Sequence, residues 1–257
     1  MTTKRPIAVF GDWHGDAGWS LTAIRSAARE GARTALHVGD FGFDFPGAKR
    51  GRYENKLNRY LVELELTLVV SLGNHDNHDT ASKLEIEADG MGRIRSNIRL
   101  LPRGGRAMLE GVVVGGLGGA FSVDANHRTA GRDWWANEEP TEQEARALMG
   151  GGPVDLLITH DVPAGVPLRG DFELSEELRR RADVTRHLLA DVVQELKPPH
   201  LVAGHWHQRL THDLVRNDGG VTRVDVLAAE NSRAGNGILV WPLERPLQIE
   251  PLIIKGL

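Results

Sequence analysis

Five short clusters of polar residues carry side chains that could hold metal ions, because they supply carboxylate, imidazole and amide donors. They are Asp12-Trp13-His14, Gly39-Asp40, Gly73-Asn74-His75-Asp76, Thr159-His160 and Gly204-His205-Trp206-His207. Oxygen and nitrogen ligands of this kind suit hard and borderline divalent cations. The chain contains no cysteine, which excludes thiolate ligands, disulfides and cysteine nucleophiles.

Each cluster follows an apolar run of strand length. The runs are Ile7–Phe10, Ala35–Val38, Leu68–Leu72, Leu156–Ile158 and Leu201–Ala203. In the first half of the chain, these runs alternate with helical patterns at Ser20–Glu30 and Tyr53–Leu64. Such alternation predicts a largely parallel sheet, with the polar clusters delivered to one edge of it.

The second half of the chain has a different pattern. Helical patterns cover Thr141–Met149 and Ser175–Leu196, and the second is predicted to break near Asp183. Short apolar runs separated by turn sequences then predict antiparallel hairpins, at Leu210–Val215, Val221–Leu227 and Ile238–Trp241. We expect two sheets packed face to face with helices outside, in one domain over residues 1–257 with an irregular insertion at about 118–152.

The spacing of the donors favours a site for two metal ions. Two cations about 3.5–4 Å apart need a bridging carboxylate, and Asp40, a lone carboxylate after a glycine at a strand end, is the natural bridge. Asp12 and His14 lie two residues apart, so in an extended segment their side chains point the same way. The same spacing pairs His205 with His207, and it leaves the intervening tryptophans to packing.

The five clusters, in this order, resemble the calcineurin-like metallophosphoesterase superfamily, whose signature is D-x-H, G-D, G-N-H-D/E, H and G-H-x-H. The resemblance implies an α/β fold, a four-layer α/β/β/α sandwich of two mixed sheets flanked by helices. It also implies two divalent metal ions, which could be Mn, Fe or Zn. The implied metal ligands are Asp12, His14 and His207 for one ion, Asn74, His160 and His205 for the other, and Asp40 as the bridge.

The resemblance further implies a catalytic role for His75, which matches a position that does not bind metal. There it serves as proton donor or transition-state stabiliser, and Asp76 orients it. A metal-bridging hydroxide would attack phosphorus while His75 assists the leaving oxygen. The remaining histidines are expected to be structural or exposed: His37, His78, His127, His187, His200 and His212.

Departures from the protein phosphatase pattern bear on the substrate. That branch follows G-D with V-D-R-G and uses G-N-H-E, whereas this chain continues Phe41-Gly42-Phe43 and ends the third motif with Asp76. The chain therefore looks closer to the bacterial phosphodiesterase-like branch, with small phosphodiesters or nucleotides as substrates. Within the insertion, Arg128 and Arg132 are candidates for binding a phosphoryl oxygen, while Trp134-Trp135 could either contact a base or anchor the loop.

Two other functions compete with the small-molecule phosphoesterase: a nuclease acting on short single-stranded ends, and a non-catalytic metal-bound scaffold. The intact ligand set and His75 favour an enzyme. The net charge of −4 argues against strong nucleic-acid binding. No apolar run is long enough for a signal peptide or a membrane span, so we expect no membrane partner and a cytoplasmic location. The sequence leaves the oligomeric state and the preference for diesters or monoesters open.

Overall fold

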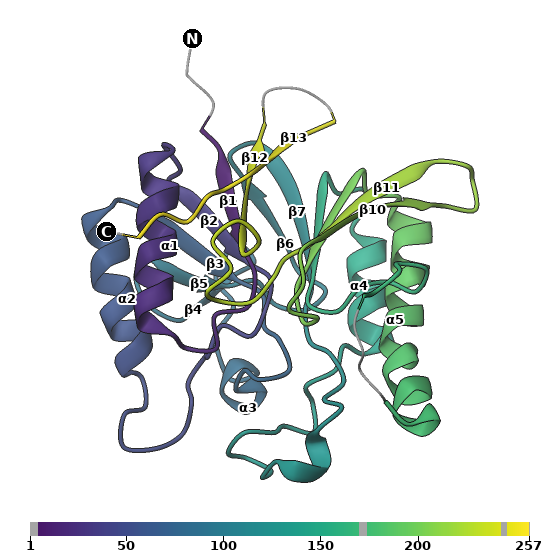
Figure 1. Ribbon diagram of the computed structural model, residues 1–257, viewed down its shortest axis with the longest axis horizontal. Helices are drawn as coiled ribbons and strands as arrows, with labels where there is room; N and C mark the ends of the chain where they lie inside the picture. The colour runs from purple at the N-terminus through teal and green to yellow at the C-terminus, as the bar shows by residue number, and fades with distance from the viewer. Residues whose placement is uncertain (1–4, 170–173, 243–245, 257) are drawn as a thin grey trace.

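A computed structural model describes residues 5–169, 174–242 and 246–256 (Figure 1). Two β-sheets pack face to face, and each is covered on its outer side by helices. This arrangement confirms the four-layer α/β/β/α sandwich expected from the sequence. In these parts of the chain, no helix combines the length and apolar character needed to cross a bilayer.

The first sheet has the strand order β13-β12-β1-β2-β3-β5-β4. Strands β1, β2, β3 and β5 run parallel, whereas β12 pairs antiparallel with β1 at the other side. The strands are β1 (Ile7–Phe10), β2 (Thr34–His37), β3 (Thr67–Val70), β4 (Gly92–Arg93), β5 (Ile98–Leu100), β12 (Gly237–Trp241) and β13 (Gln248–Pro251).

The second sheet has the strand order β10-β11-β9-β8-β7-β6. Its central strands β11, β9, β8 and β7 are parallel to one another, and β10 and β6 are antiparallel at the edges. The strands are β6 (Arg106–Leu109), β7 (Val112–Leu117), β8 (Leu156–Thr159), β9 (His200–Ala203), β10 (Leu210–Val215) and β11 (Val221–Val226).

Helices α1 (Ala17–Arg29) and α2 (Arg52–Glu63) cover the first sheet, and α4 (Glu142–Gly150) and α5 (Glu176–Leu196) cover the second (Figure 1). The short α3 (His78–Ala81) and a 3₁₀ turn (Ala125–His127) lie in connections. Helix α5 continues through Asp183, so the predicted break there is wrong. Ala182, Thr185 and Leu189 are buried on the same side of α5, so the buried face of the helix continues past Asp183 without interruption.

Strand β1 shows why the apolar runs form buried strands. Its residues Ile7 and Val9 lie in the core between the two sheets, while Ala8 and Phe10 pack with the core under α1 and α2. Both faces of the strand are buried, so it reads as a continuous apolar run rather than an alternating one. The same burial on both sides holds the strand ends in fixed positions beneath the polar clusters.

The three apolar runs after His207 differ in part from the predicted hairpins. Strands β10 and β11 do form an antiparallel hairpin. The third run, β12, leaves this sheet and joins the other beside β1. The connection from Leu227 to Asn236 is long enough to cross between the layers, which a tight turn could not do. Because β11 also pairs in parallel with β9, its carboxyl end lies at the same edge as the polar clusters.

Candidate metal centre

The two sheets together bring the polar clusters to one place. Each cluster sits in a connection that leaves the carboxyl end of a parallel strand, the usual location of sites in open α/β sheets. The first sheet supplies Asp12 after β1, Asp40 after β2, and Asn74 and His75 after β3. The second sheet supplies His160 after β8, and His205 and His207 after β9.

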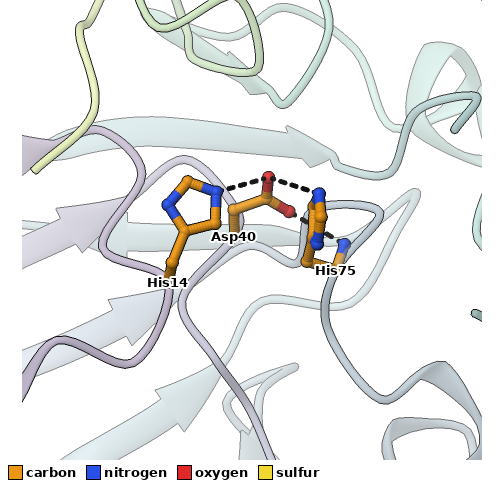
Figure 2. Close-up of side chains that lie close together, drawn as sticks. All are labelled: His14, Asp40 and His75. Carbon is orange, nitrogen blue, oxygen red and sulfur yellow. Dashed lines mark hydrogen bonds and ion pairs between the residues drawn. The ribbon is translucent and has the colours of Figure 1, made fainter. Parts of the chain in front are cut away.

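Asp40 lies at the centre of this cluster and is 1% exposed. Its Oδ2 atom is 3.4 Å from His14 Nε2, and its Oδ1 atom is 3.3 Å from His160 Nε2. Figure 2 shows the carboxylate between the rings of His14 and His75. The two oxygens of one carboxylate thus face two different histidines, an arrangement that fits a ligand shared by two metal ions.

The donors fall into three groups whose ligand atoms lie within 4.8 Å of one another, and Asp40 belongs to all three. The groups are His14, Asp40 and His75; Asp40, His160 and His205; and Asp12, Asp40 and His207. Asn74 adds an amide oxygen, since its Oδ1 lies 3.1 Å from His160 Nε2. Carboxylates, imidazoles and an amide oxygen at this spacing fit divalent cations.

The charges at the site also favour cations. Burial opposes protonation of His14 and of His160, yet the carboxylate of Asp40 outweighs it and raises the pKa of His14 to about 10 and that of His160 to about 9. Burial raises the pKa of Asp12 to about 7. Two protonated imidazoles therefore stabilise the buried carboxylates in the metal-free protein, in positions where a metal ion would replace their protons.

Groups outside the cluster orient the candidate ligands. Glu230 Oε2 lies 2.9 Å from His14 Nδ1, so that nitrogen donates and Nε2 faces Asp40. In the same way, His160 Nδ1 donates to the carbonyl oxygen of Val38 at 3.1 Å. Partners of this kind fix the tautomer and the ring position of a ligating histidine.

Left-handed backbone conformations place four of the candidate ligands. The φ angles are 44° at His14, 52° at Asp40, 67° at His205 and 52° at His207. A non-glycine residue in this region costs on the order of 1–3 kcal/mol, and such residues tend to cluster at functional sites. Turns therefore bring the paired residues together, rather than the extended segments expected from their spacing, and the intervening Trp13 is fully buried.

Three motif glycines have a steric reason to be glycine. A Cβ atom at Gly39 would collide with the ring of His160, one at Gly73 with Asp40, and one at Gly204 with Asp12. The backbone must approach the ligands this closely because the donors converge from both sheets. Any side chain at these three positions would displace a candidate ligand.

His75 lies between Asp40 and the segment that joins β7 to α4. Its backbone N–H donates to Asp40 Oδ1 at 2.9 Å, and its ring Nε2 is 3.9 Å from Asp40 Oδ2 (Figure 2). The guanidinium of Arg128 donates to the same Nε2 at 2.7 Å. Burial, and after it the charge of Arg128, lowers the pKa of His75. The hydrogen bond from Arg128 occupies the Nε2 lone pair that a metal would need.

Asp76 does not have the position expected of a partner for His75. Its carboxylate accepts hydrogen bonds from the backbone N–H groups of Phe41, Gly42, Phe43 and Gly73, at 2.7–3.2 Å. Among the described residues, no hydrogen bond joins it to the His75 ring. Asp76 instead ties the loop after β2 to the loop after β3, which sets Asp40 and His75 at a fixed separation. Burial raises its pKa to about 6.

The structure separates the two arginines predicted to bind substrate. The side chain of Arg128 is 8% exposed and forms an ion pair with Asp124 at 2.7 Å, beside His75. Arg132 is exposed, and in the described parts of the chain its side chain contacts none of the site residues. Trp135 is 2% exposed and packs edge-on against Phe45, with ring centroids 6.3 Å apart. This tryptophan anchors the loop.

Several residues at the site were missed by reasoning from the sequence. Glu230 follows the carboxyl end of β11, so the same signal, a polar residue after a parallel strand, could have found it had β11 been assigned as parallel. Ser122, from the segment between β7 and α4, accepts a hydrogen bond from Asn74, and Glu138, from the same segment, accepts from Ser122. Asn236 donates to the carbonyl oxygen of Asp12 at 3.2 Å. For these last three, no sequence pattern gave a signal.

Comparisons with known proteins identify the family and the fold. The family model for calcineurin-like phosphoesterases matches residues 5–209. The structure of TT1561 from Thermus thermophilus is similar, with a TM-score of 0.59 and 16% identity over 97% of this chain and 100% of that one. A dimetal phosphatase from Danio rerio has a TM-score of 0.51 and 12% identity over 98% and 99%. A search of curated proteins found no match. The chain belongs to the calcineurin-like phosphoesterase family.

Proposed function

We propose that this protein is a phosphoesterase that requires two divalent metal ions and hydrolyses small phosphodiesters or nucleotides. The observation that carries the proposal is the position of Asp40, whose two oxygens face His14 and His160 at 3.4 and 3.3 Å. Membership of the calcineurin-like phosphoesterase family supports metal-dependent hydrolysis of phosphate esters.

The proposed ligands are the members of the three donor groups other than His75, together with Asn74. Asp40 would bridge the two ions, which would be Mn, Fe or Zn. The other ligands are Asp12, His14 and His207 for one ion and Asn74, His160 and His205 for the other. When bound, such a pair supplies Lewis acidity, which lowers the pKa of water to near neutrality and offsets charge on a phosphoryl group.

His75 and Arg128 supply the remaining chemistry. The hydrogen bond from Arg128 to His75 Nε2 places both groups at the rim of the cluster. The planar guanidinium carries further donors that suit a phosphoryl oxygen. His75, close to that oxygen, would stabilise or protonate the leaving group. Arg128 is thus the better supported of the two arginines as a substrate contact, and Arg132 would contribute only to substrates that extend over the exposed loop.

A groove beside the cluster supports a small anionic substrate. It has a volume of about 490 Å³, borders His14, and is lined by three cationic side chains and the exposed ring of Phe45. The cations are Lys49, Arg50 and Arg52. Positive charge next to an aromatic ring suits a nucleotide, in which a phosphate lies near a flat base.

The test is a metal-reconstituted activity screen. Protein stripped of metal is reloaded with Mn, Fe or Zn and assayed with bis-p-nitrophenyl phosphate, p-nitrophenyl phosphate, cyclic nucleotides and short single-stranded oligonucleotides. We expect two metals per chain by elemental analysis, and turnover that is highest on a diester or a nucleotide. Preference for the oligonucleotides would instead indicate a nuclease, and metal binding without any turnover would indicate a scaffold.

The variant Asp40→Asn tests the two-metal site itself. Loss of one anionic oxygen weakens the bridge, so both bound metal and turnover should fall. Asp191→Asn, an exposed aspartate on α5, is the matched control and should behave as wild type. A fully metallated and fully active Asp40→Asn protein contradicts the proposal.

A further inference from the structure

We propose that Ser122 and Glu138 position the side-chain amide of Asn74 so that its oxygen, not its nitrogen, faces the metal centre. This inference rests on the proposed role of Asn74 as a metal ligand. Ser122 and Glu138 both lie in the segment between β7 and α4, so this segment would contribute to metal binding.

The amide of Asn74 has two ends with opposite chemistry. Only its Oδ1 can bind a cation, whereas Nδ2 is a donor with no free lone pair. A rotation of the amide by half a turn would present the wrong end to the metal. Asn74 is 1% exposed, so water does not hold it in place. Protein groups must therefore fix its orientation.

Ser122 provides the contact that selects one orientation. Asn74 Nδ2 donates to Ser122 Oγ at 2.9 Å, while Asn74 Oδ1 lies 3.1 Å from His160 Nε2. A hydroxyl alone would not be decisive, because it can either donate or accept. If Ser122 donated to Asn74, the amide could turn its oxygen away from the metal centre.

Glu138 removes that freedom. The Ser122 hydroxyl donates to Glu138 Oε2 at 2.7 Å, and the Ser122 backbone N–H donates to Oε1 at 2.8 Å. An ionised carboxylate only accepts, so the single hydroxyl proton is committed to Glu138. The oxygen of Ser122 is left to accept from Asn74. Both residues are buried, Ser122 at 1% and Glu138 at 3% exposure, so the chain of bonds is shielded from water.

The expected size of the effect comes from comparable metal sites. Loss of a group that orients a metal ligand typically lowers metal affinity about 10–100-fold. Ser122→Ala should therefore lower the affinity for one of the two metal ions by that factor and leave the affinity for the other near its wild-type value. Ser82→Ala, an exposed serine on the turn after α3, is the matched control and should change neither constant.

The test is a double-mutant cycle read out by metal binding. Binding constants are measured at pH 8 by competition with a chromophoric chelator, because the pKa of Glu138, raised by burial, is about 7. The partner variant is Asn74→Asp, whose two oxygens are both ligands and need no orientation. Ser122→Ala should lower metal affinity about 10–100-fold when Asn74 is present, and it should leave metal affinity nearly unchanged in the Asn74→Asp background.

Each outcome of the cycle decides the question. An equal loss in both backgrounds means that Ser122 only stabilises the loop, and no loss in either means that the amide is held elsewhere; both overturn the inference. A wild-type protein that binds no pair of metals refutes the proposed function instead. If Ser122→Ala does not fold, Glu138→Gln replaces it. The single amide oxygen of glutamine can accept from only one of the two Ser122 donors, and when it accepts the backbone N–H its nitrogen faces the hydroxyl, whose proton is then free to turn toward Asn74.

Discussion

Raising the pH from 7 to 9 should strengthen the binding of divalent metals to the metal-free protein. A histidine binds a metal only as the neutral imidazole, so each protonated ligand must lose a proton first. In the metal-free protein the carboxylate of Asp40 overcomes the effect of burial and raises the pKa of His14 to about 10 and that of His160 to about 9. Both rings are therefore protonated at pH 7.

The structure gives the size of this effect. With pKa values of about 10 and 9, both histidines remain largely protonated up to about pH 8.5. Filling both metal positions then releases about two protons from the histidines, and near pH 7 a further fraction of a proton from Asp12, whose pKa burial raises to about 7. The overall binding constant should therefore rise by at least about two powers of ten per pH unit between 7 and 8. The slope should flatten as the pH passes 9 and then 10.

Titration calorimetry in HEPES and in Tris measures the proton count, because the two buffers differ in their enthalpy of protonation. His187→Gln, which replaces an exposed histidine on α5, should release the same number of protons as wild type. A release below about half a proton at pH 7.5 would refute the reasoning, because the ligand histidines would then already be neutral.

Four further results are expected. The metal-free protein should lose thermal stability from pH 7 to 10. The pKa values of His14 and His160 are higher in the folded protein than the unfolded value of about 6.5, so the stabilisation that their protonation gives is complete below pH 6.5 and is lost as the pH rises through 9 and 10. A melting temperature that does not change with pH would contradict this. His75→Ala should keep its metals but lose about 10²–10⁴-fold in turnover on esters with poor leaving groups, and an equal loss on p-nitrophenyl esters would remove His75 from the acid role. Arg128→Ala, assayed at saturating metal and below its melting temperature, should raise KM or lower turnover more than Arg132→Ala does, with the exposed Arg146→Ala on α4 as the control. Wild-type kinetics for Arg128→Ala would place the substrate contacts elsewhere. Trp135→Ala should lower the free energy of unfolding by about 3–5 kcal/mol, measured by denaturant titration, since its side chain is 2% exposed, and a loss below about 1 kcal/mol would mean that it does not anchor the loop.

The layers of the fold and the gathering of the polar clusters were predictable because they follow from local patterns. A buried parallel strand reads as an apolar run, and the polar residue after it must lie at the carboxyl edge. The direction of β11 was not predictable in this way. The turn sequence Asn217-Asp218-Gly219-Gly220 marks the β10–β11 hairpin, but nothing local shows that β11 also pairs in parallel with β9.

The contacts that orient the ligands lay beyond the sequence patterns for a related reason. Glu230 lies 216 positions from His14, and Ser122 lies 48 positions from Asn74. Such contacts depend on how the loops pack, and a single sequence carries no periodicity that reports it. Asp76 shows the converse case. Proximity in sequence suggested a contact between Asp76 and the neighbouring His75. In the structure, the Asp76 carboxylate instead accepts hydrogen bonds from backbone N–H groups of the loop after β2.

The convergence of donors from both sheets has a mechanical consequence. Asp12 follows the first strand, and His207 lies in a connection 195 positions later in the chain, in the opposite layer. A cation held between them would act as a cross-link that closes a loop of about three-quarters of the chain, and a constraint on the unfolded state grows with the length of the closed loop. Separation of the two sheets would then require release of the ion, so chelators should speed global unfolding and proteolysis together.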